Sequence, residues 1–427
     1  MASQFATTDN LPIWASWFGR LRALFGTTAR QGLWGLVDQV VVSGTNFLTT
    51  VILGRFCGAG ELGAYMLGFT VLMMIAVTQK ALITCPYTVF INRLVGNDRA
   101  HYAGSVLMHY VMLALLAIAG LGIAAIFMPS LWVLIVVAPF ILLRDLARRT
   151  ALAHLRVRQV LVLDVMVAVL QIGLLGTLAL AGRLTVMSAF LIIAGSCATA
   201  GLGWLGLNRR AFIIDRKRVR SELTRSWKFG RWVFASQMTG ALNDYCIYWL
   251  IAIAMGAQST GMLAACMTIV LLANPVVLGV ANIFEPRAAR ALAIDGPQEL
   301  SRVTWKVTWM LAATMTAFVV MVGLLGEDLM VLLYGVQYAG HQRLITIMAV
   351  CKALQSTTMP CSDALRVLEG SHFNFQARLM RLAITLVGCA VLIPSHGLIG
   401  VAYACLGAAV VDCLWRVLAF CRQVYRT

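Results

Sequence analysis

Three long apolar stretches of the sequence contain charged side chains. Such side chains can bind a substrate or an ion only where a partner or water stabilises their charge. Lys80 lies near the middle of the stretch 63–93, and Lys352 lies similarly deep in the stretch 344–365. Arg144 directly follows the unbroken apolar run 131–143. An ionised group at the centre of a bilayer costs about 2.5–3.5 kcal/mol on insertion scales, so each one needs a partner, a water-filled cavity or a function.

These cations predict a cavity that binds an anion. Arg148 stands four positions after Arg144, so the two side chains share one helix face. Lysine and arginine hold phosphate groups by charge-assisted hydrogen bonds, which strengthen where the dielectric constant is low, and such a cavity would repel organic cations. The alternative is that the arginines extend to the headgroups of the inner leaflet. The predicted substrate-binding residues are Lys80, Arg144, Arg148 and Lys352.

Three aspartates are candidates for ion pairing or for coupling transport to an ion gradient. Asp145 and Arg149 are four residues apart on one face and are expected to pair with each other. Asp38 and Asp244 lie in the first and seventh predicted helices, where each could pair with a deep cation or carry a coupling proton. A purely structural ion pair is an equally open interpretation for both.

The composition predicts a membrane protein, because 60% of the residues are hydrophobic and 12% are charged. Backbone amides cannot stay unpaired in lipid, so every span should be helical, and the expected fold is an all-α polytopic bundle. Pro86 predicts a kink in the second helix. About twelve apolar stretches approach or exceed the length of about 20 residues needed to cross a bilayer. They are 34–55, 63–93, 104–127, 131–149, 160–181, 186–207, 229–255, 261–284, 307–325, 344–365, 379–394 and 398–420.

The distribution of Lys and Arg predicts the topology. With both termini in the cytoplasm, most of the 34 basic residues fall in the inner connections, as expected for a multi-pass protein of the inner (plasma) membrane. The net charge of +17 is then a topology signal with affinity for anionic membrane lipids, and no nucleic-acid partner is implied.

The chain divides into two halves that resemble each other. We expect an N-terminal segment 1–30, with an amphipathic helix around Trp14, then a six-helix lobe 31–207, a basic linker 208–228 and a second six-helix lobe 229–427. Six helices per lobe make the repeat parallel, and in such transporters the substrate binds between the lobes near the bilayer midplane. The same residue type recurs 198 positions later in five pairs: Trp34 and Trp232, Gln39 and Gln237, Gly58 and Gly256, Ala59 and Ala257, and Gly63 and Gly261.

Catalysis, metals and cofactors find little support in the sequence. The 11 cysteines and six histidines show no metal-ligand spacing, and no phosphate-binding loop of the P-loop type occurs. We therefore expect no metal site, no cofactor and no enzymatic activity. A membrane glycan polymerase or ligase is a further alternative, but it would need a sizeable outer surface, and the longest outer connection, 326–343, is short.

The stretch SGTNFLTTVILGRFCGAGELGAYMLGFTVLMM, with Gly58, Gly63 and Tyr65, resembles the opening of the polysaccharide (O-antigen) flippases of the multidrug, oligosaccharidyl-lipid and polysaccharide exporter superfamily. LMVLLYGVQYAGHQRLITIMAV and HGLIGVAYACLGAAVVDCLWR are similar to later helices of that family. The resemblance implies a twelve-helix exporter that moves a polyprenyl-diphosphate-linked oligosaccharide to the outer leaflet, with other polysaccharide-assembly proteins as possible partners. A cation-coupled multidrug antiporter is the alternative. Lipid II flippases of the same superfamily usually carry additional helices.

Overall fold

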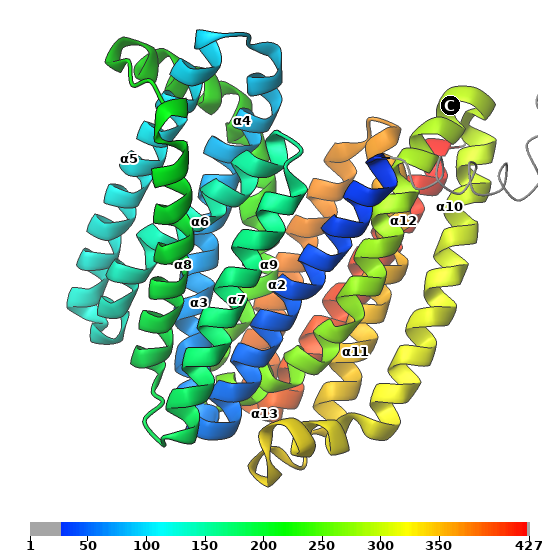
Figure 1. Ribbon diagram of the computed structural model, residues 1–427. Helices are drawn as coiled ribbons and strands as arrows, with labels where there is room; N and C mark the ends of the chain where they lie inside the picture. The colour runs from blue at the N-terminus through cyan, green and yellow to red at the C-terminus, as the bar shows by residue number, and fades with distance from the viewer. Residues whose placement is uncertain (1–26, 425–427) are drawn as a thin grey trace, which may run out of the picture.

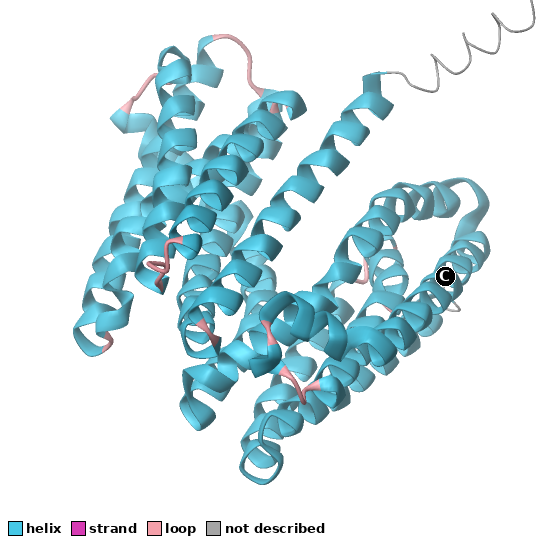
Figure 2. Cartoon of the chain, turned by 60° about the horizontal axis from the view of Figure 1, so that its bottom comes forward, coloured by secondary structure: helices cyan, strands magenta, loops and turns pink. Residues whose placement is uncertain are grey.

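The computed structural model describes residues 27–424, and the predicted amphipathic segment around Trp14 lies outside this range. The described chain is helical, with short connections and no strand (Figures 1 and 2). In the first half the helices are α2 (Thr27–Cys57), α3 (Ala59–Gln79), α4 (Cys85–Phe90), α5 (Asn97–Phe127), α6 (Trp132–Ala153), α7 (Val157–Leu180) and α8 (Val186–Asn208). In the second half they are α9 (Arg216–Val270), α10 (Asn274–Tyr334), α11 (Gln342–Thr357), α12 (Met359–Val367) and α13 (Ser371–Val424).

The described chain makes twelve passes, because three of the long helices contain a reversal. α9, α10 and α13 each include one glycine with positive φ, namely Gly256, Gly296 and Gly397, at which two helices meet. Eight continuous helical stretches are long and apolar enough to cross a membrane, and two of these hold more than one pass. The more polar α11 and α12 together supply the tenth pass. The prediction of a helical bundle with about twelve spans is confirmed.

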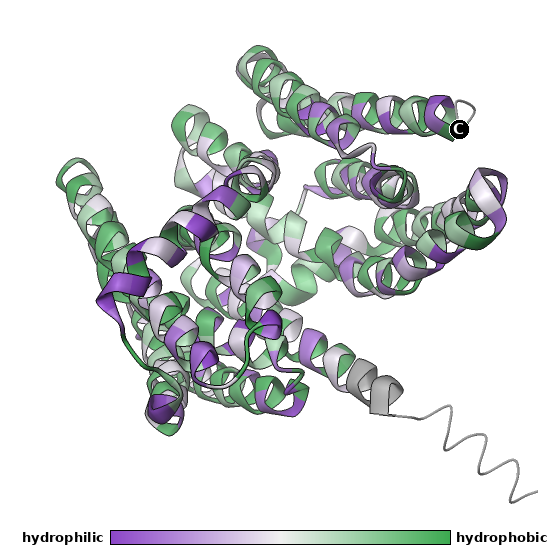
Figure 3. Ribbon diagram, turned by 90° about the horizontal axis from the view of Figure 1, so that it is seen from above, coloured by the Kyte–Doolittle hydropathy of each residue, from purple (hydrophilic) through white to green (hydrophobic). Residues whose placement is uncertain are grey.

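Large apolar side chains cover the outside of the bundle, as expected for contact with lipid. Leu116, Val320 and Val387 are 68%, 55% and 65% exposed, although each lies in the middle part of a membrane pass. Figure 3 shows hydrophobic residues along most of the outer helices. Exposed apolar surface on this scale is unfavourable in water and favourable in a bilayer.

The connections at one end of the bundle carry many arginines, and we call this the arginine-rich end; it lies at the top of Figure 1. It includes the turns α6–α7 and α12–α13 and the segment between α8 and α9. Most of the basic linker 208–228 is helical, because α9 begins at Arg216, where Asp215 caps its first turn by accepting a hydrogen bond from the amide of Lys217 at 3.0 Å.

At the opposite end the two halves meet where the sequence repeat was strongest. A Cβ atom on Gly63 would lie 1.8 Å from the carbonyl oxygen of Ala257, and one on Gly261 would lie 1.8 Å from the carbonyl oxygen of Ala59. The contact is reciprocal, so a two-fold operation relates α3 to the second part of α9. This closest approach of the halves requires glycine on both sides, and we call it the glycine crossing.

Other contacts between the halves lie at or near this end. The guanidinium of Arg55 donates from Nη1 to the carbonyl oxygen of Leu332 at 2.5 Å, at the end of α10. The buried hydroxyl of Tyr338 donates to the carbonyl oxygen of Gly54 at 3.1 Å. Together with the glycine crossing, these bonds hold the halves together at the end opposite the arginines.

The predicted kink in the second pass takes the form of a single π turn, Lys80–Thr84, between α3 and α4. Pro86 stands two residues after the end of this turn and has no N–H for a regular α-helical hydrogen bond, which explains the wider turn at this place. A π turn inside a membrane helix often marks a functional position. Lys80 is the first residue of this turn.

Candidate functional site

A cavity of about 640 Å³ lies between Lys80 and the second half of the chain. Its volume falls within the range of ligand-binding sites, roughly 300–1,000 Å³. It extends from Lys352 and Asp244 to Glu285 and Arg366, whose side chains are 57% and 51% exposed near the arginine-rich end. We call it the central cavity. Its charged lining residues are Lys80, Asp244, Glu285, Lys352, Asp363, Arg366, Arg378, Arg381, Asp412 and Arg416.

Two of the six cations in this lining are neutralised by carboxylates of the lining itself. Arg366 pairs with Asp363 and also approaches Glu285 at 3.6 Å. Arg416 donates from Nη2 to Asp412 at 2.8 Å. The remaining four cations face a single remaining carboxylate, that of Asp244. The central cavity therefore carries an excess of positive charge.

Asp244 is surrounded by cations without forming a close pair. Its Oδ1 atom lies 3.8 Å from Nη2 of Arg381, which is too long for a hydrogen bond. Its side chain is 64% exposed although its helix lies inside the bundle, so the carboxylate faces the water-accessible cavity. Within residues 27–424, the ammonium groups of Lys80 and Lys352 have no carboxylate within 4.0 Å.

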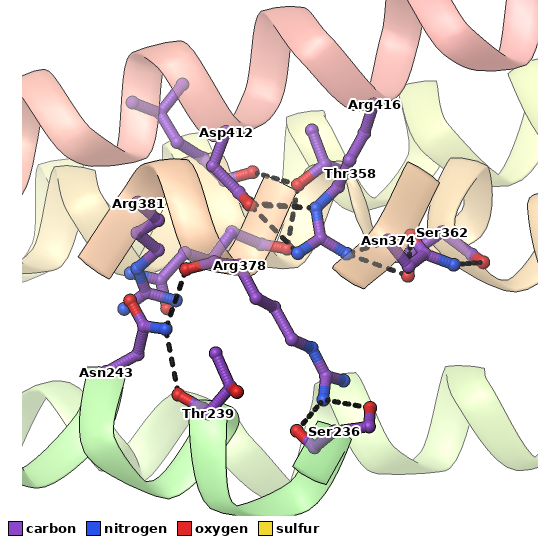
Figure 4. A network of polar contacts seen from close by, with 12 residues as sticks. Ser236, Thr239, Asn243, Thr358, Ser362, Asn374, Arg378, Arg381, Asp412 and Arg416 are labelled. Atoms are coloured by element: carbon purple, nitrogen blue, oxygen red, sulfur yellow. Dashed lines mark hydrogen bonds and ion pairs between the residues drawn. The ribbon is translucent and has the colours of Figure 1, made fainter. Parts of the chain in front are cut away.

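Arg378 is held in place by α9 without a carboxylate (Figure 4). It donates from Nη1 to the carbonyl oxygen of Ser236 at 3.0 Å and to the Ser236 hydroxyl at 3.3 Å. Nη1 would lie 3.4 Å from a Cβ on Gly240, so the small residue leaves room for the guanidinium. Asn243 donates to the carbonyl oxygen of Arg378 at 2.9 Å and ties the same two helices together.

A buried network behind Arg378 fixes the helices that carry it. Arg416 is 8% exposed, and its Nε atom donates to both carboxylate oxygens of Asp412 at 3.0 Å. Its Nη1 atom donates to the Ser362 hydroxyl at 2.8 Å and to the Asn374 amide oxygen at 3.2 Å. The guanidinium of Arg416 finds all these hydrogen-bond acceptors within the protein (Figure 4), so Arg416 is a structural residue.

A second cavity, of about 330 Å³, lies in the first half and differs in its charge balance. Arg144 donates to Asp164 at 2.5 Å, and Arg148 bridges Asp38 at 2.5 Å and Asp164 at 2.7 Å. Asp38 and Asp164 are 3% and 1% exposed. Their carboxylates neutralise the two arginines, so the charges of this cluster are balanced within the protein.

The predicted site residues divide between the two cavities. Lys80 borders both, and Lys352 lines the central cavity. Arg144 and Arg148 line the smaller cavity but point at carboxylates.

The predicted aspartates have different partners. Asp145 accepts from Arg149 at 2.7 Å, the pair that its spacing suggested. Asp38 pairs with Arg148, whereas Asp244 lies in the central cavity.

Sequence reasoning missed Arg378 and Arg381. Arg378 lies one residue before the predicted apolar stretch 379–394 and Arg381 lies at its start, whereas α13 begins at Ser371 and carries both into the bundle. Their spacing of three residues on one helix face was the available signal. No three His, Cys, Asp or Glu side chains within residues 27–424 form a group that could hold a metal ion.

No protein-family model and no curated protein matches the sequence, but solved structures match the fold. A multidrug resistance MATE family transporter of the MOP superfamily, in an inward-facing conformation, is 16% identical, covers 92% of this chain and 95% of its own, and has a TM-score of 0.69. The lipid II flippase MurJ, in an inward closed conformation, is 12% identical, with coverage of 91% and 87% and a TM-score of 0.70.

An outward-facing MATE transporter of the same superfamily is 14% identical, covers 93% of this chain and 96% of its own, and has a lower TM-score of 0.58. At these identities the likeness concerns the fold alone. The chain therefore has the two-lobed, multi-pass membrane fold of the MATE and MurJ transporters.

Proposed function

We propose that this protein is a flippase that moves a polyprenyl-diphosphate-linked oligosaccharide, such as a polysaccharide repeat unit, from the cytoplasmic to the outer leaflet by alternating access. The observation that carries the proposal is the charge of the central cavity, in which four cations face one carboxylate. A diphosphate is the part of such a substrate that needs this charge, because phosphates are held by lysine and arginine in low-dielectric surroundings.

The direction of entry follows from which end of the bundle is closed. The glycine crossing closes the end opposite the arginines, and the central cavity reaches toward the arginine-rich end. The greater similarity to the inward-facing MATE structure than to the outward-facing one supports the same arrangement. We place the arginine-rich end on the cytoplasmic side of the inner membrane. The substrate then enters from the side on which lipid-linked sugars would be assembled.

A cation-coupled multidrug antiporter is the second candidate, and one observation favours it. Asp244 is a solvent-accessible carboxylate at the wall of the cavity, where it could bind an organic cation or a coupling ion. The similarity of the fold to MATE multidrug transporters is consistent with this candidate. Against it stand Lys352, Arg378 and Arg381, which repel cations from the same wall.

The test compares glycan export with drug resistance in one set of cells. We expect Lys80→Gln combined with Lys352→Gln to abolish delivery of the glycan to the outer leaflet at normal protein abundance. Arg302→Gln is the matched control, because Arg302 is 81% exposed and outside the cavity, and it should leave delivery unchanged.

Overexpression should not raise drug resistance if the proposal is correct. Drug resistance that disappears with Asp244→Asn, together with normal glycan delivery in the lysine variant, would replace the flippase with the antiporter.

A further inference from the structure

The helical hairpins α6–α7 and α12–α13 occupy equivalent places in the two halves, and their turns allow a residue-by-residue alignment. Leu155 and Glu369 are the described non-glycine residues with positive φ, at 56° and 58°. Leu155 lies in the turn between α6 and α7, and Glu369 lies in the turn between α12 and α13. A non-glycine residue in this region is uncommon, so two at matching turns define a common register, in which positions of the second hairpin are 214 higher.

This register places residues of opposite charge at one position of the two halves. Asp164 of α7 corresponds to Arg378 of α13, and Arg148 corresponds to Ser362. Asp38 corresponds to Ser236 in the register that relates Gly58 to Gly256.

The positions of Asp38 and Asp164 lie close together in the first half, and their counterparts Ser236 and Arg378 lie close together in the second. Arg148 bridges Asp38 and Asp164 in the first half, and Arg378 binds Ser236 in the second half.

At these positions the second half lacks the carboxylates of the first half, so three of its cations have no close carboxylate partner. In the first half every arginine of the cluster has a carboxylate oxygen at 2.5–2.7 Å. In the second half Lys352, Arg378 and Arg381 share Asp244, at 3.8 Å from Arg381. The positive charge must be solvated by water or balanced by counterions or a ligand, because an uncompensated charge inside the bundle is unfavourable.

We infer that Lys352, Arg378 and Arg381 are the diphosphate-binding residues and that Arg144 and Arg148 of the first half are structural. The inference rests on the proposed function and specifies its site. Arg378 uses Nη1 for Ser236, so its other guanidinium nitrogens remain for the ligand, and Arg381 can bind a phosphate through two parallel hydrogen bonds.

The experiment measures binding of geranylgeranyl diphosphate to the full chain in nanodiscs, with geranylgeranyl monophosphate and the neutral alcohol as references. Arg381→Gln should weaken binding of the diphosphate about tenfold or more, the effect of losing a hydrogen bond to a charged group, while binding of the alcohol stays unchanged. Arg381→Lys should recover part of the loss, because it restores the charge without the planar fork. Arg378→Gln should weaken binding in the same way.

The matched control removes charge from the first half without leaving a buried charge unpaired. Arg144→Gln combined with Asp164→Asn keeps that cluster balanced, since Arg148 retains Asp38. Diphosphate binding should not change.

Loss of binding in this control, with normal binding by the Arg381 and Arg378 variants, would overturn the assigned site and leave the flippase proposal standing. Wild-type binding that does not distinguish diphosphate from alcohol would overturn both. Diphosphate binding that depends on Arg381, without transport of any lipid-linked glycan, would overturn the proposed function alone.

Discussion

Enlarging Gly63 should force the two halves apart at the glycine crossing. A Cβ at this position would lie 1.8 Å from the carbonyl oxygen of Ala257, whereas carbon–oxygen contacts in proteins begin at about 3.3 Å. The helices must therefore separate by about 1.5 Å for alanine and further for leucine. Overpacking of this kind costs about 1–3 kcal/mol, which corresponds to a shift of roughly 5- to 150-fold away from the state closed at this end.

Spin labels at the repeat-related residues Gly60 and Gln258, in a cysteine-free background, would report this shift. Both residues lie next to the crossing, and neither is buried. We expect Gly63→Leu to move the distance distribution to longer values, and Gly261→Leu to have the same effect because the contact is reciprocal. Gly120→Leu is the control, since no atom lies within 4 Å of its added Cβ. An unchanged distribution in both leucine variants would refute the interpretation of the crossing as the closed end.

Three further predictions concern stability and the π turn. Asp38→Asn should lower the stability by about 2 kcal/mol, the value of a hydrogen bond to a charged group, and the double variant with Arg148→Gln should recover part of it; equal apparent Tm values for all three proteins would contradict this. Tyr338→Phe should cost about 1 kcal/mol, because the carbonyl oxygen of Gly54 loses a buried donor, and an unchanged apparent Tm would show that the bond contributes nothing. Pro86→Ala should allow a regular α-helix and rotate the preceding segment by about 100°. Transport should therefore fall while the apparent Tm does not. Undiminished transport would show that transport does not depend on the π turn.

The helices could be predicted from the sequence because lipid makes the pattern simple. A span must be apolar over its whole length, so composition alone located most passes. The glycines at 58, 63, 256 and 261 also carried a readable signal, since they recur at one spacing and occupy equivalent places in the structure. The ends of helices were less predictable, because polar residues extend a helix without changing its hydropathy.

The partners of the deep charges could not be read from hydropathy. Arg148 and Asp164 lie seven and nine residues from Leu155, on opposite sides of a tight turn, and antiparallel helices bring such residues face to face. That turn was not visible in the sequence, because its conformation depends on a leucine with positive φ. Arg378 and Arg381 were missed because they lie at the edge of the apolar stretch 379–394, whereas α13 begins eight residues earlier, at Ser371, and carries both into the bundle. Lys80 and Lys352 were predicted to face a cavity, and both line the central one.

The most direct test of the central proposal is a transport assay with purified protein in lipid vesicles. A fluorescent polyprenyl-diphosphate-linked oligosaccharide in the inner leaflet becomes accessible to an external quencher only after it has crossed the bilayer. We predict that the wild-type chain transports this lipid, and that it does not transport the same glycan on a neutral polyprenyl ether or a fluorescent organic cation. Transport of the organic cation, with none of the diphosphate lipid, would contradict the proposal.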